Sequence, residues 1–367
     1  MSEVGILGIG TAVPPYTLDQ AEAARFASLL SSHNEDQTRL VGVLYRRSSV
    51  RQRHLAFLDT QPHGGETAPE LQSLFIETQP DSTCRLGPTT AERMAYYAAR
   101  SVPLAEQAAG CALAAAAVPA SGITHLVTIS CTGFVAPGVD VALITRLGLS
   151  PQIERVNVGF MGCQGALNAL RVARALVRSA DARVLVCAVE LCALHFQYSA
   201  EPDAIVANSL FADGAAAAVL GATDSEAHWR LSSNGAGLVP DSLDAMTWTV
   251  GDHGFAMTLS PRVPSLIEEQ LSPWMNGWLK PHGLTTADIG SWAIHPGGAR
   301  IVSSAEKALG LEPSAGAVAR EVLAEHGNMS SPTVLFVLKR LMERGAQRPC
   351  VALAFGPGLS IEAALLT

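Results

Sequence analysis

The chain has 367 residues, of which 48% are hydrophobic and 16% are charged, and its formal net charge is −8. This composition indicates a large buried core, and the negative charge argues against a general nucleic-acid binder. No segment supplies the ~20 uninterrupted apolar residues of a membrane span, and the N-terminus, with Glu3 and no basic stretch, does not resemble a signal peptide. We therefore expect a cytoplasmic protein with no membrane span and no nucleic-acid partner.

Seven short apolar runs, each bounded by turn residues, predict buried strands. They lie at residues 4–10, 124–130, 155–160, 183–191, 215–221, 291–295 and 350–356. Amphipathic stretches predict helices at residues 91–107, 166–180, 300–311 and 332–345. Strands that alternate with helices indicate an α/β architecture whose sheets are covered on both faces. Residues 48–80 hold several Gly and Pro residues, which predict a long, partly irregular surface excursion.

A polar stretch, GATDSEAHWR at residues 221–230, follows a strongly apolar run and predicts a boundary between two halves. We place these halves at residues 1–223 and 224–367. The first half closes with FADGAAAAVLG and the second with AFGPGLSIEAALL. This similarity points to a duplicated α/β unit.

The seven cysteines form no CxxC pair, so the sequence predicts neither a zinc site nor a redox motif. Most are expected to be free thiols in a reducing compartment. Cys163 differs because it lies in GFMGCQGALNALRVA, where a strand meets an apolar helix. The helix N-terminus, its arginines at 171, 174 and 178, and the lack of Asp or Glu from residue 155 to 180 favour a thiolate. A small residue packed at the junction is the alternative.

Two other segments can complete a site with Cys163. His295 ends a strand and precedes Pro-Gly-Gly, which favours a position facing a cleft; a core histidine bonded to backbone is the alternative. Asn328 lies in the loop GNMSSP, where Ser331 is expected to be an N-cap with Pro332 at the first helical position. A simple helix-entry turn is the alternative there. Together, the thiol, imidazole and amide suit acyl transfer, with the thiolate carrying the acyl group and the other two polarising a thioester carbonyl.

Two weaker signals are not expected to carry chemistry. GILGIGTAVPP contains GxG, but Val13 replaces the third glycine and prolines follow, so no dinucleotide-binding helix starts there. Glu190 ends a buried strand and is expected to be a structural carboxylate that caps a loop.

Several segments, taken in chain order, resemble the type III polyketide synthases, the family of chalcone synthase and its bacterial relatives. The resemblance spans nearly the whole chain and is carried by GIGTAVPP, SCTGFVAPGVD, GFMGCQGALNALRVA, VELCALHF, LFADGAAAAV, HPGGARI, GNMSS and AFGPGLSIE. It implies a thiolase fold, with duplicated βαβαβ-type halves in five α-β-α-β-α layers, and a homodimer. It also implies acyl-CoA and malonyl-CoA as substrates, with no metal, pyridine nucleotide or carrier-protein arm required.

The resemblance assigns roles to five residues. Cys163 matches the acylated nucleophile, and His295 and Asn328 match the pair that activates it and stabilises the enolate from malonyl decarboxylation. Phe211 matches the gatekeeper phenylalanine between the CoA tunnel and the cavity. Met257 stands where the family has a second aromatic gate residue, which implies a more open entrance.

Other matching positions are expected to line the cavity or to bind CoA. Cys192 and His195 stand where chalcone synthases have threonines, and Ala136 stands where plant enzymes insert a methionine into the partner's cavity. These features look bacterial, of the kind seen in alkylpyrone and alkylresorcinol synthases. The remaining matches are Ser330 in GNMSS, Pro357 and Gly358 in the GPG turn, and Arg47 and Arg46 at the CoA phosphates. A solvated basic loop is the alternative for the two arginines.

The resemblance thus implies an enzyme that loads an acyl starter on Cys163, decarboxylates malonyl-CoA, extends the chain iteratively and cyclises it. A fatty acyl starter and an alkylpyrone or alkylresorcinol-type product are expected. One alternative is a ketoacyl-acyl carrier protein synthase III-like enzyme, although its histidine typically precedes Gln-Ala-Asn rather than Pro-Gly-Gly. A catalytically silent scaffold of the same fold is the alternative from another class.

Overall fold

The computed structural model describes residues 3–60, 69–71, 75, 86–180 and 182–367. About half of the excursion predicted over residues 48–80 lies outside these ranges. Its described beginning is more regular than predicted, because β3 (Gln52–His54) pairs with β2 (Thr17–Asp19) and β4 (Leu58–Thr60) pairs with β5 (Pro69–Leu71). Leu55 and Phe57 between these strands are buried, so this part of the segment belongs to the core.

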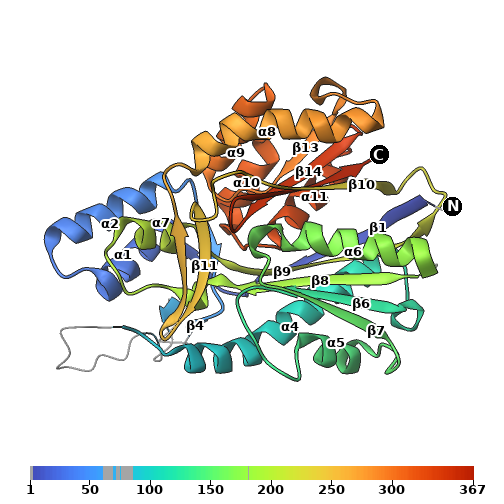
Figure 1. Cartoon of the computed structure of the whole chain (residues 1–367). Helices are drawn as coiled ribbons and strands as arrows, with labels where there is room; N and C mark the ends of the chain where they lie inside the picture. Colours follow the sequence, from blue (N-terminus) through green and yellow to red (C-terminus); the bar gives the residue numbers. More distant parts are fainter. Residues whose placement is uncertain (1–2, 61–68, 72–74, 76–85, 181) are drawn as a thin grey trace.

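The main sheet has nine strands in the order β13-β14-β15-β10-β1-β9-β8-β6-β7 (Figure 1). Their bounds are β1 (Glu3–Ala12), β6 (His125–Ser130), β7 (Glu154–Gly159), β8 (Val184–Leu191), β9 (Asp213–Thr223), β10 (Trp229–Leu238), β13 (Ser291–Ile294), β14 (Cys350–Gly356) and β15 (Ser360–Leu366). All seven predicted strands are present, but β7 is largely exposed, contrary to the burial predicted for it. The sequence analysis missed β10 and β15.

The two halves of the sheet have the same pattern of parallel and antiparallel strand pairs, counted outward from the centre of the sheet. This repeated pattern reveals the duplication. In the first half, β6 and β8 are parallel, β8 and β9 antiparallel, and β9 and β1 antiparallel. In the second half, β13 and β14 are parallel, β14 and β15 antiparallel, and β15 and β10 antiparallel. A short antiparallel pairing of β1 with β10 joins the two halves. The boundary at residue 223 stays a prediction.

Helices form three layers around the two halves of the sheet (Figure 1). α4 (Thr90–Ala116) packs on β1, β9 and β8, with α5 (Val139–Leu147) beside it, while α8 (Val263–Leu279) and α9 (Ala299–Leu309) cover the opposite side. Between them, α6 (Gly165–Ala180) and α11 (Thr333–Glu343) each contact strands of both halves. The α-β-α-β-α arrangement of a thiolase-type fold is therefore confirmed.

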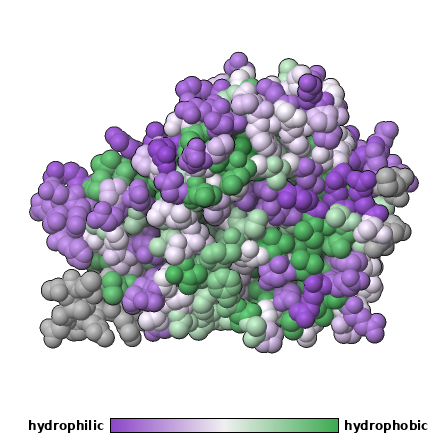
Figure 2. Space-filling model, viewed as in Figure 1, coloured by the Kyte–Doolittle hydropathy of each residue, from purple (hydrophilic) through white to green (hydrophobic). Residues whose placement is uncertain are grey.

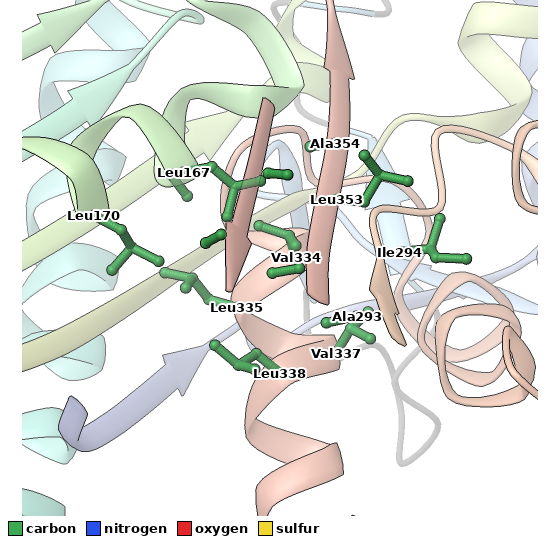
Figure 3. Close-up of a cluster of buried hydrophobic side chains, with 14 of the residues drawn as sticks. Leu167, Leu170, Ala293, Ile294, Val334, Leu335, Val337, Leu338, Leu353 and Ala354 are labelled. Atoms are coloured by element: carbon green, nitrogen blue, oxygen red, sulfur yellow. The ribbon is translucent and has the colours of Figure 1, made fainter. Parts of the chain in front are cut away.

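A cluster of buried hydrophobic side chains joins the middle layer to the sheet (Figure 3). Leu167 and Leu170 of α6 meet Leu335 of α11, and Leu353 of β14 and Ile294 of β13 close the cluster. Each of these side chains is at most 1% exposed. Burial of such leucine and isoleucine side chains stabilises the fold by roughly 1.5–3 kcal/mol each, and it fixes the starts of α6 and α11, which carry the site.

Further elements lie beyond one end of the sheet, where Figure 1 shows them left of centre. They are α1 (Gln20–Ser31), α2 (Glu35–Arg47), α7 (Pro202–Leu210) and the hairpin of β11 (Met246–Gly251) with β12 (Gly254–Leu259). The helix α10 (Ala317–His326) packs against α11, α9 and β3. α7 packs against α1, α2 and β12. Within the described part of the chain, no helix has both the length and the apolarity that crossing a membrane requires.

Candidate active site

Cys163 lies, as predicted, between the edge strand β7 and the central helix α6. It belongs to a short 3-10 turn, Gly162–Gln164, that leads directly into the helix. Gly162 has φ 67°, and a Cβ on it would lie 2.5 Å from Cδ of Pro357. Both the backbone conformation and the close approach therefore require glycine at this position.

The Cys163 thiol is held neutral, contrary to the expected thiolate. It is 7% exposed, and burial raises its pKa to about 11, although hydrogen bonds with Ser330 and Asn328 lower it in part. The arginines of α6 do not help, because Arg171 pairs with Glu362 and Arg174 donates to backbone carbonyls of β10. Desolvation in the apolar cavity therefore outweighs the helix N-terminus.

His295 follows the last residue of β13, and its backbone N–H donates to the carbonyl of Leu353 at 2.7 Å. The side chain is 1% exposed, and neither ring nitrogen has a hydrogen-bond partner among the described residues. Burial lowers its pKa to about 3, so the imidazole is neutral. Buried polar groups normally have hydrogen-bond partners, so these two unpaired nitrogens are an exception. A bound substrate can supply the missing hydrogen bonds.

Asn328 follows α10, and its side chain is 2% exposed. Its Oδ1 accepts from the backbone N–H of Ser330 at 2.8 Å, which turns Nδ2 the other way, 3.4 Å from the carbonyl of Gly297. The amide is thus oriented by the backbone and keeps donor capacity for a ligand.

Ser331 is not the N-cap of the next helix, contrary to prediction. The helix α11 starts at Thr333 after Pro332, and no side chain caps it. The Ser331 hydroxyl instead donates to Oε1 of Glu190 at 2.7 Å. A buried carboxylate is costly unless several donors bind it. The hydrogen bond from Ser331 to Glu190 is therefore favoured over one that would cap the helix.

Glu190 is the structural carboxylate that its position predicted. It ends β8 at 0% exposure, and burial raises its pKa. It accepts from the backbone N–H of Cys131 at 2.9 Å and from the hydroxyls of Thr132 and Ser331 at 2.6 and 2.7 Å. These bonds join the end of β6 to the entry of α11, and so join the two halves beneath the site.

The three predicted reactive side chains line one cavity of about 460 Å³. Its walls include Cys163, His295, Asn328, Leu210, Phe211, Met257, Ile301 and Phe355. A neighbouring cavity of about 340 Å³ shares Cys163, Phe211, Met246 and Met257 with it. Its other walls are Cys131, Thr132, Gly162, Cys192, Trp248, Ser330 and Pro357. Cys163 therefore faces both spaces.

A third, largely apolar chamber, here called the rear chamber, adjoins this cavity. It measures about 660 Å³ and shares Cys192, Phe211, Trp248 and Met257 with the catalytic side. Its other walls include Ala23, Phe26, Ala27 and Leu30 of α1, Leu55, Phe57, Ala204 and Ala207. The expected gate residues thus stand where the spaces meet.

His195 also lines the rear chamber, where it is fixed and neutral. Its ring stacks on Phe255 with centroids 4.0 Å apart. Nδ1 accepts from the Phe255 N–H at 3.0 Å, so Nε2 carries the proton and donates to the Thr132 carbonyl at 2.7 Å. Burial lowers its pKa to about 3, which makes this histidine part of the wall.

Four predicted positions lie away from the cavity walls. Arg46 and Arg47 are exposed in the last turn of α2. Ala136 is exposed and joined to Pro137 by a cis peptide bond. Gly358 has φ 70° and lies behind Pro357, with its N–H donating to the Met246 carbonyl at 2.8 Å.

Sequence reasoning missed several residues that line the site. Trp248 and Met246 come from β11, and Trp248 Nε1 donates to the carbonyl of Cys131 at 2.8 Å. Cys131 in turn has its Sγ 3.4 Å from Oγ of Ser330. No motif surrounds Trp248, and only the alternation in MTWTV pointed to a strand there. Among the described residues, no group of three or more His, Cys, Asp or Glu side chains could hold a metal ion.

Comparison with known proteins agrees with this geometry. Residues 2–224 match the model of the N-terminal domain of chalcone and stilbene synthases, and residues 230–367 match that of the C-terminal domain. The chain belongs to this family. It is a type III polyketide synthase, a condensing acyltransferase, and the rival carrier-protein synthase and scaffold assignments are set aside at the level of the family.

Relatives and solved structures extend the match over the whole chain. The "Alpha-pyrone synthesis polyketide synthase-like Pks18" of Mycobacterium tuberculosis is 34% identical, over 98% of this chain and 90% of its own. The crystal structure of PKS-I from the brown alga Ectocarpus siliculosus has a TM-score of 0.88 and 30% identity, over 100% and 98% of the two chains. A type III pentaketide synthase from Neurospora crassa has a TM-score of 0.83 and 30% identity, over 99% of each chain.

Proposed function

We propose that this type III polyketide synthase loads a fatty acyl starter on Cys163 and extends it with malonyl-CoA to an alkylpyrone or alkylresorcinol-type product. The observation that carries the proposal is the single cavity lined by Cys163, His295 and Asn328. Within it, the imidazole lacks hydrogen-bond partners and the amide of Asn328 retains donor capacity.

Loading begins with a neutral thiol beside a neutral imidazole. The sulfur of Cys163 attacks the carbonyl carbon of the acyl-CoA as its proton passes to His295. The CoA thiolate leaves and takes that proton, and the starter becomes a thioester of Cys163. Transfer at the moment of attack suits a cavity in which burial disfavours both charged groups.

Extension uses the two donors of the site. The thioester carbonyl of malonyl-CoA accepts hydrogen bonds from the N–H groups of His295 and Asn328. Its carboxylate leaves as CO2, and the electron pair of the broken C–C bond forms an enolate on that carbonyl. The enolate carbon attacks the acyl-Cys163, which releases the thiolate and leaves the longer chain on CoA for the next round.

The rear chamber supports an aliphatic starter. Its Ala, Leu and Phe side chains offer apolar area to an alkyl chain. Its polar wall residues Arg53, Asn208 and Gln197 already have hydrogen-bond partners within the protein. A relative that is named for alpha-pyrone synthesis points the same way. Entry from the surface is assigned to the space between Phe211 and Met257, with the exposed Arg46 and Arg47 binding the phosphates of CoA.

A homodimer is the proposed assembly. The edge strand β7 is largely exposed, and Val156 on it has 41% of its surface exposed. Phe134 and Val135 are exposed as well, at 54% and 39%. Hydrophobic residues gather on the lower right of the face in Figure 2, over the region of α5, α6 and β7. An apolar sheet edge of this kind needs a cover, and a second copy supplies one.

The proposed compartment is the cytoplasm. All the cysteines in the described ranges are free thiols, which a reducing compartment favours.

The proposal is tested by incubating the enzyme with malonyl-CoA and acetyl-, hexanoyl-, lauroyl- or the aromatic benzoyl-CoA and identifying the products by liquid chromatography and mass spectrometry. We expect alkylpyrones or alkylresorcinols that carry the starter's alkyl chain. His295→Ala and Asn328→Ala should each lose malonyl decarboxylation, while Arg262→Ala on the surface should not. Products from an aromatic starter alone would contradict the fatty acyl assignment.

A further inference from the structure

The gate residue Phe211 lies at the end of a helix that has no glycine cap. α7 ends at Leu210, and Phe211 continues in extended conformation with φ −72° and ψ 144°. The final carbonyls of a helix lack partners within the helix, so their hydrogen bonds must come from elsewhere. Here this requirement falls beside the catalytic cavity.

Four consecutive carbonyls at this helix end are held by three donors from distant parts of the chain. Nη1 of Arg53 donates to the carbonyls of Asn208 and Phe211, at 2.6 and 2.8 Å. The side chain of Gln20 donates to the carbonyl of Ser209 at 2.8 Å, and the backbone N–H of Asn328 donates to that of Leu210 at 2.8 Å. The gate is thus fixed from outside its own helix.

Arg53 is unlike the other basic residues of its segment. Arg46 and Arg47 are exposed, whereas Arg53 turns inward and is only 4% exposed. Its guanidinium lies 5.6 Å from the ring centroid of Tyr45. No carboxylate within the described residues forms a salt bridge with it. Its buried charge is therefore balanced by the carbonyl dipoles of the gate together with the buried Asp213 and the Tyr45 hydroxyl, and its side chain also forms part of the rear-chamber wall.

The gate is also joined to the catalytic amide. Phe211 and Asn328 form a parallel β-bridge, in which the Ala212 N–H donates to the Asn328 carbonyl at 2.9 Å. The stem of Arg53 touches the second strand of this bridge, since a Cβ on Gly327 would lie 3.1 Å from Cγ of Arg53. One arginine therefore contacts both the Phe211 and the Asn328 side of the bridge.

We propose that Arg53 is a positioning residue that sets the gate Phe211 and the catalytic amide of Asn328 in register with each other. It touches no reacting atom. By holding the helix end and the bridge together, it links the width of the entrance to the orientation of the donor that stabilises the enolate. The inference rests on the proposed function, because it gives Phe211 and Asn328 the roles assigned there.

The test compares Arg53→Met and Arg53→Lys with a control, Arg39→Met. Arg39 lies on α2 outside the basic segment, and its side chain is 75% exposed in a loose pair with Asp36. Two rates are measured per folded active site, counted by loading of Cys163 with a radiolabelled acyl-CoA. One is release of CO2 from malonyl-CoA without a starter, which reports on Asn328. The other is the ratio of loading rates for lauroyl-CoA and acetyl-CoA, which reports on Phe211.

For Arg53→Met, we expect decarboxylation to fall about tenfold or more and the loading ratio to change severalfold, since a misplacement of about 1 Å is enough for such losses. Arg53→Lys, which keeps one donor, should recover part of both effects, and Arg39→Met should match the wild type. If Arg53→Met fails to fold, the two rates of Arg53→Lys are compared with those of the wild type instead.

A variant with lower thermal stability but with wild-type rates and a wild-type loading ratio would overturn the proposal. A wild type that releases no CO2 would instead overturn the proposed function, and this inference with it.

Discussion

At the scale of single residues, Cys163 shows how burial can reverse a prediction made from charge. The helix start, the arginines and the absence of acids nearby all favoured a thiolate. The structure instead commits Arg171 and Arg174 to other partners and buries the thiol, which raises its pKa to about 11. Which way a long side chain turns is decided by packing, and the local sequence does not contain that information.

The resting state of Cys163 can be read from its reactivity. Because the pKa is raised, the rate of alkylation by iodoacetamide should keep rising with pH above 9, instead of reaching a plateau near neutrality. Ser330→Ala should be slower than the wild type at each pH, because the hydrogen bond from Ser330 lowers that pKa. Peptide mapping assigns the modified thiol, with Cys163→Ala as the control. A plateau near pH 7 would show that the thiolate is the resting form.

At the scale of elements, apolar runs predicted seven strands of the main sheet, of which all but the exposed edge strand β7 are mostly buried. They failed for β10 and β15, each of which breaks the apolar pattern. β10 contains Gly235 and Gly237, over which the rings of Trp278 and Trp274 lie. β15 contains Glu362, which is buried because Arg171 and Asn168 bind it from α6. Both strands depend on side chains from another element, the tryptophans over β10 and the arginine and asparagine at β15. Such contacts between distant segments cannot be identified from a short stretch of sequence.

The hairpin β11–β12 supplies a second element-scale prediction, at Trp248. This side chain lines both the neighbouring cavity that Cys163 faces and the rear chamber, and its ring packs edge-on to His195 and Phe255. Trp248→Ala should join the two spaces and shift the products toward longer starter chains, whereas Trp248→Phe should change them little. Product alkyl lengths from a mixture of acyl-CoAs give the measurement. An unchanged length distribution in an active Trp248→Ala enzyme would show that the ring is no partition.

The middle layer gives a prediction on stability. Leu335 of α11 is 0% exposed among Leu167, Leu170 and Leu353. Leu335→Ala should lower the free energy of unfolding by about 2–5 kcal/mol, since it removes buried methyl groups and leaves a cavity. Leu243→Ala, at a leucine that is 70% exposed, is the matched control and should change it little. Urea denaturation followed by circular dichroism measures both, and equal effects would contradict this account of the core.

At the scale of the whole molecule, the three reactive residues were predictable because each follows a strand or precedes a helix. Such ends meet at one edge of a sheet, so Cys163, His295 and Asn328 were expected to converge, and they line one cavity. The walls were less predictable. Trp248 and Cys131 reach the site through tertiary contacts of a hairpin and a loop, and Arg53 reaches the gate from a segment that was expected to bind CoA.

The proposed dimer is tested at the edge of the sheet. Val156→Glu on β7 adds a charge to the surface that a second copy is expected to cover, and it should convert a dimer into a monomer. Val250→Glu on β11, at a valine that is 51% exposed, is the control and should leave the dimer intact. Size-exclusion chromatography with light scattering gives the mass. A dimer that survives Val156→Glu would place the interface elsewhere.

The central claim is that Cys163 carries the growing acyl chain, and intact-protein mass spectrometry tests it most directly. Wild type and Cys163→Ala are incubated with hexanoyl- or lauroyl-CoA and then with malonyl-CoA. We predict an acyl adduct on the wild type alone, which is lost as extended product appears after malonyl-CoA is added. An adduct of the same size on Cys163→Ala, or product formation without Cys163, would contradict the account.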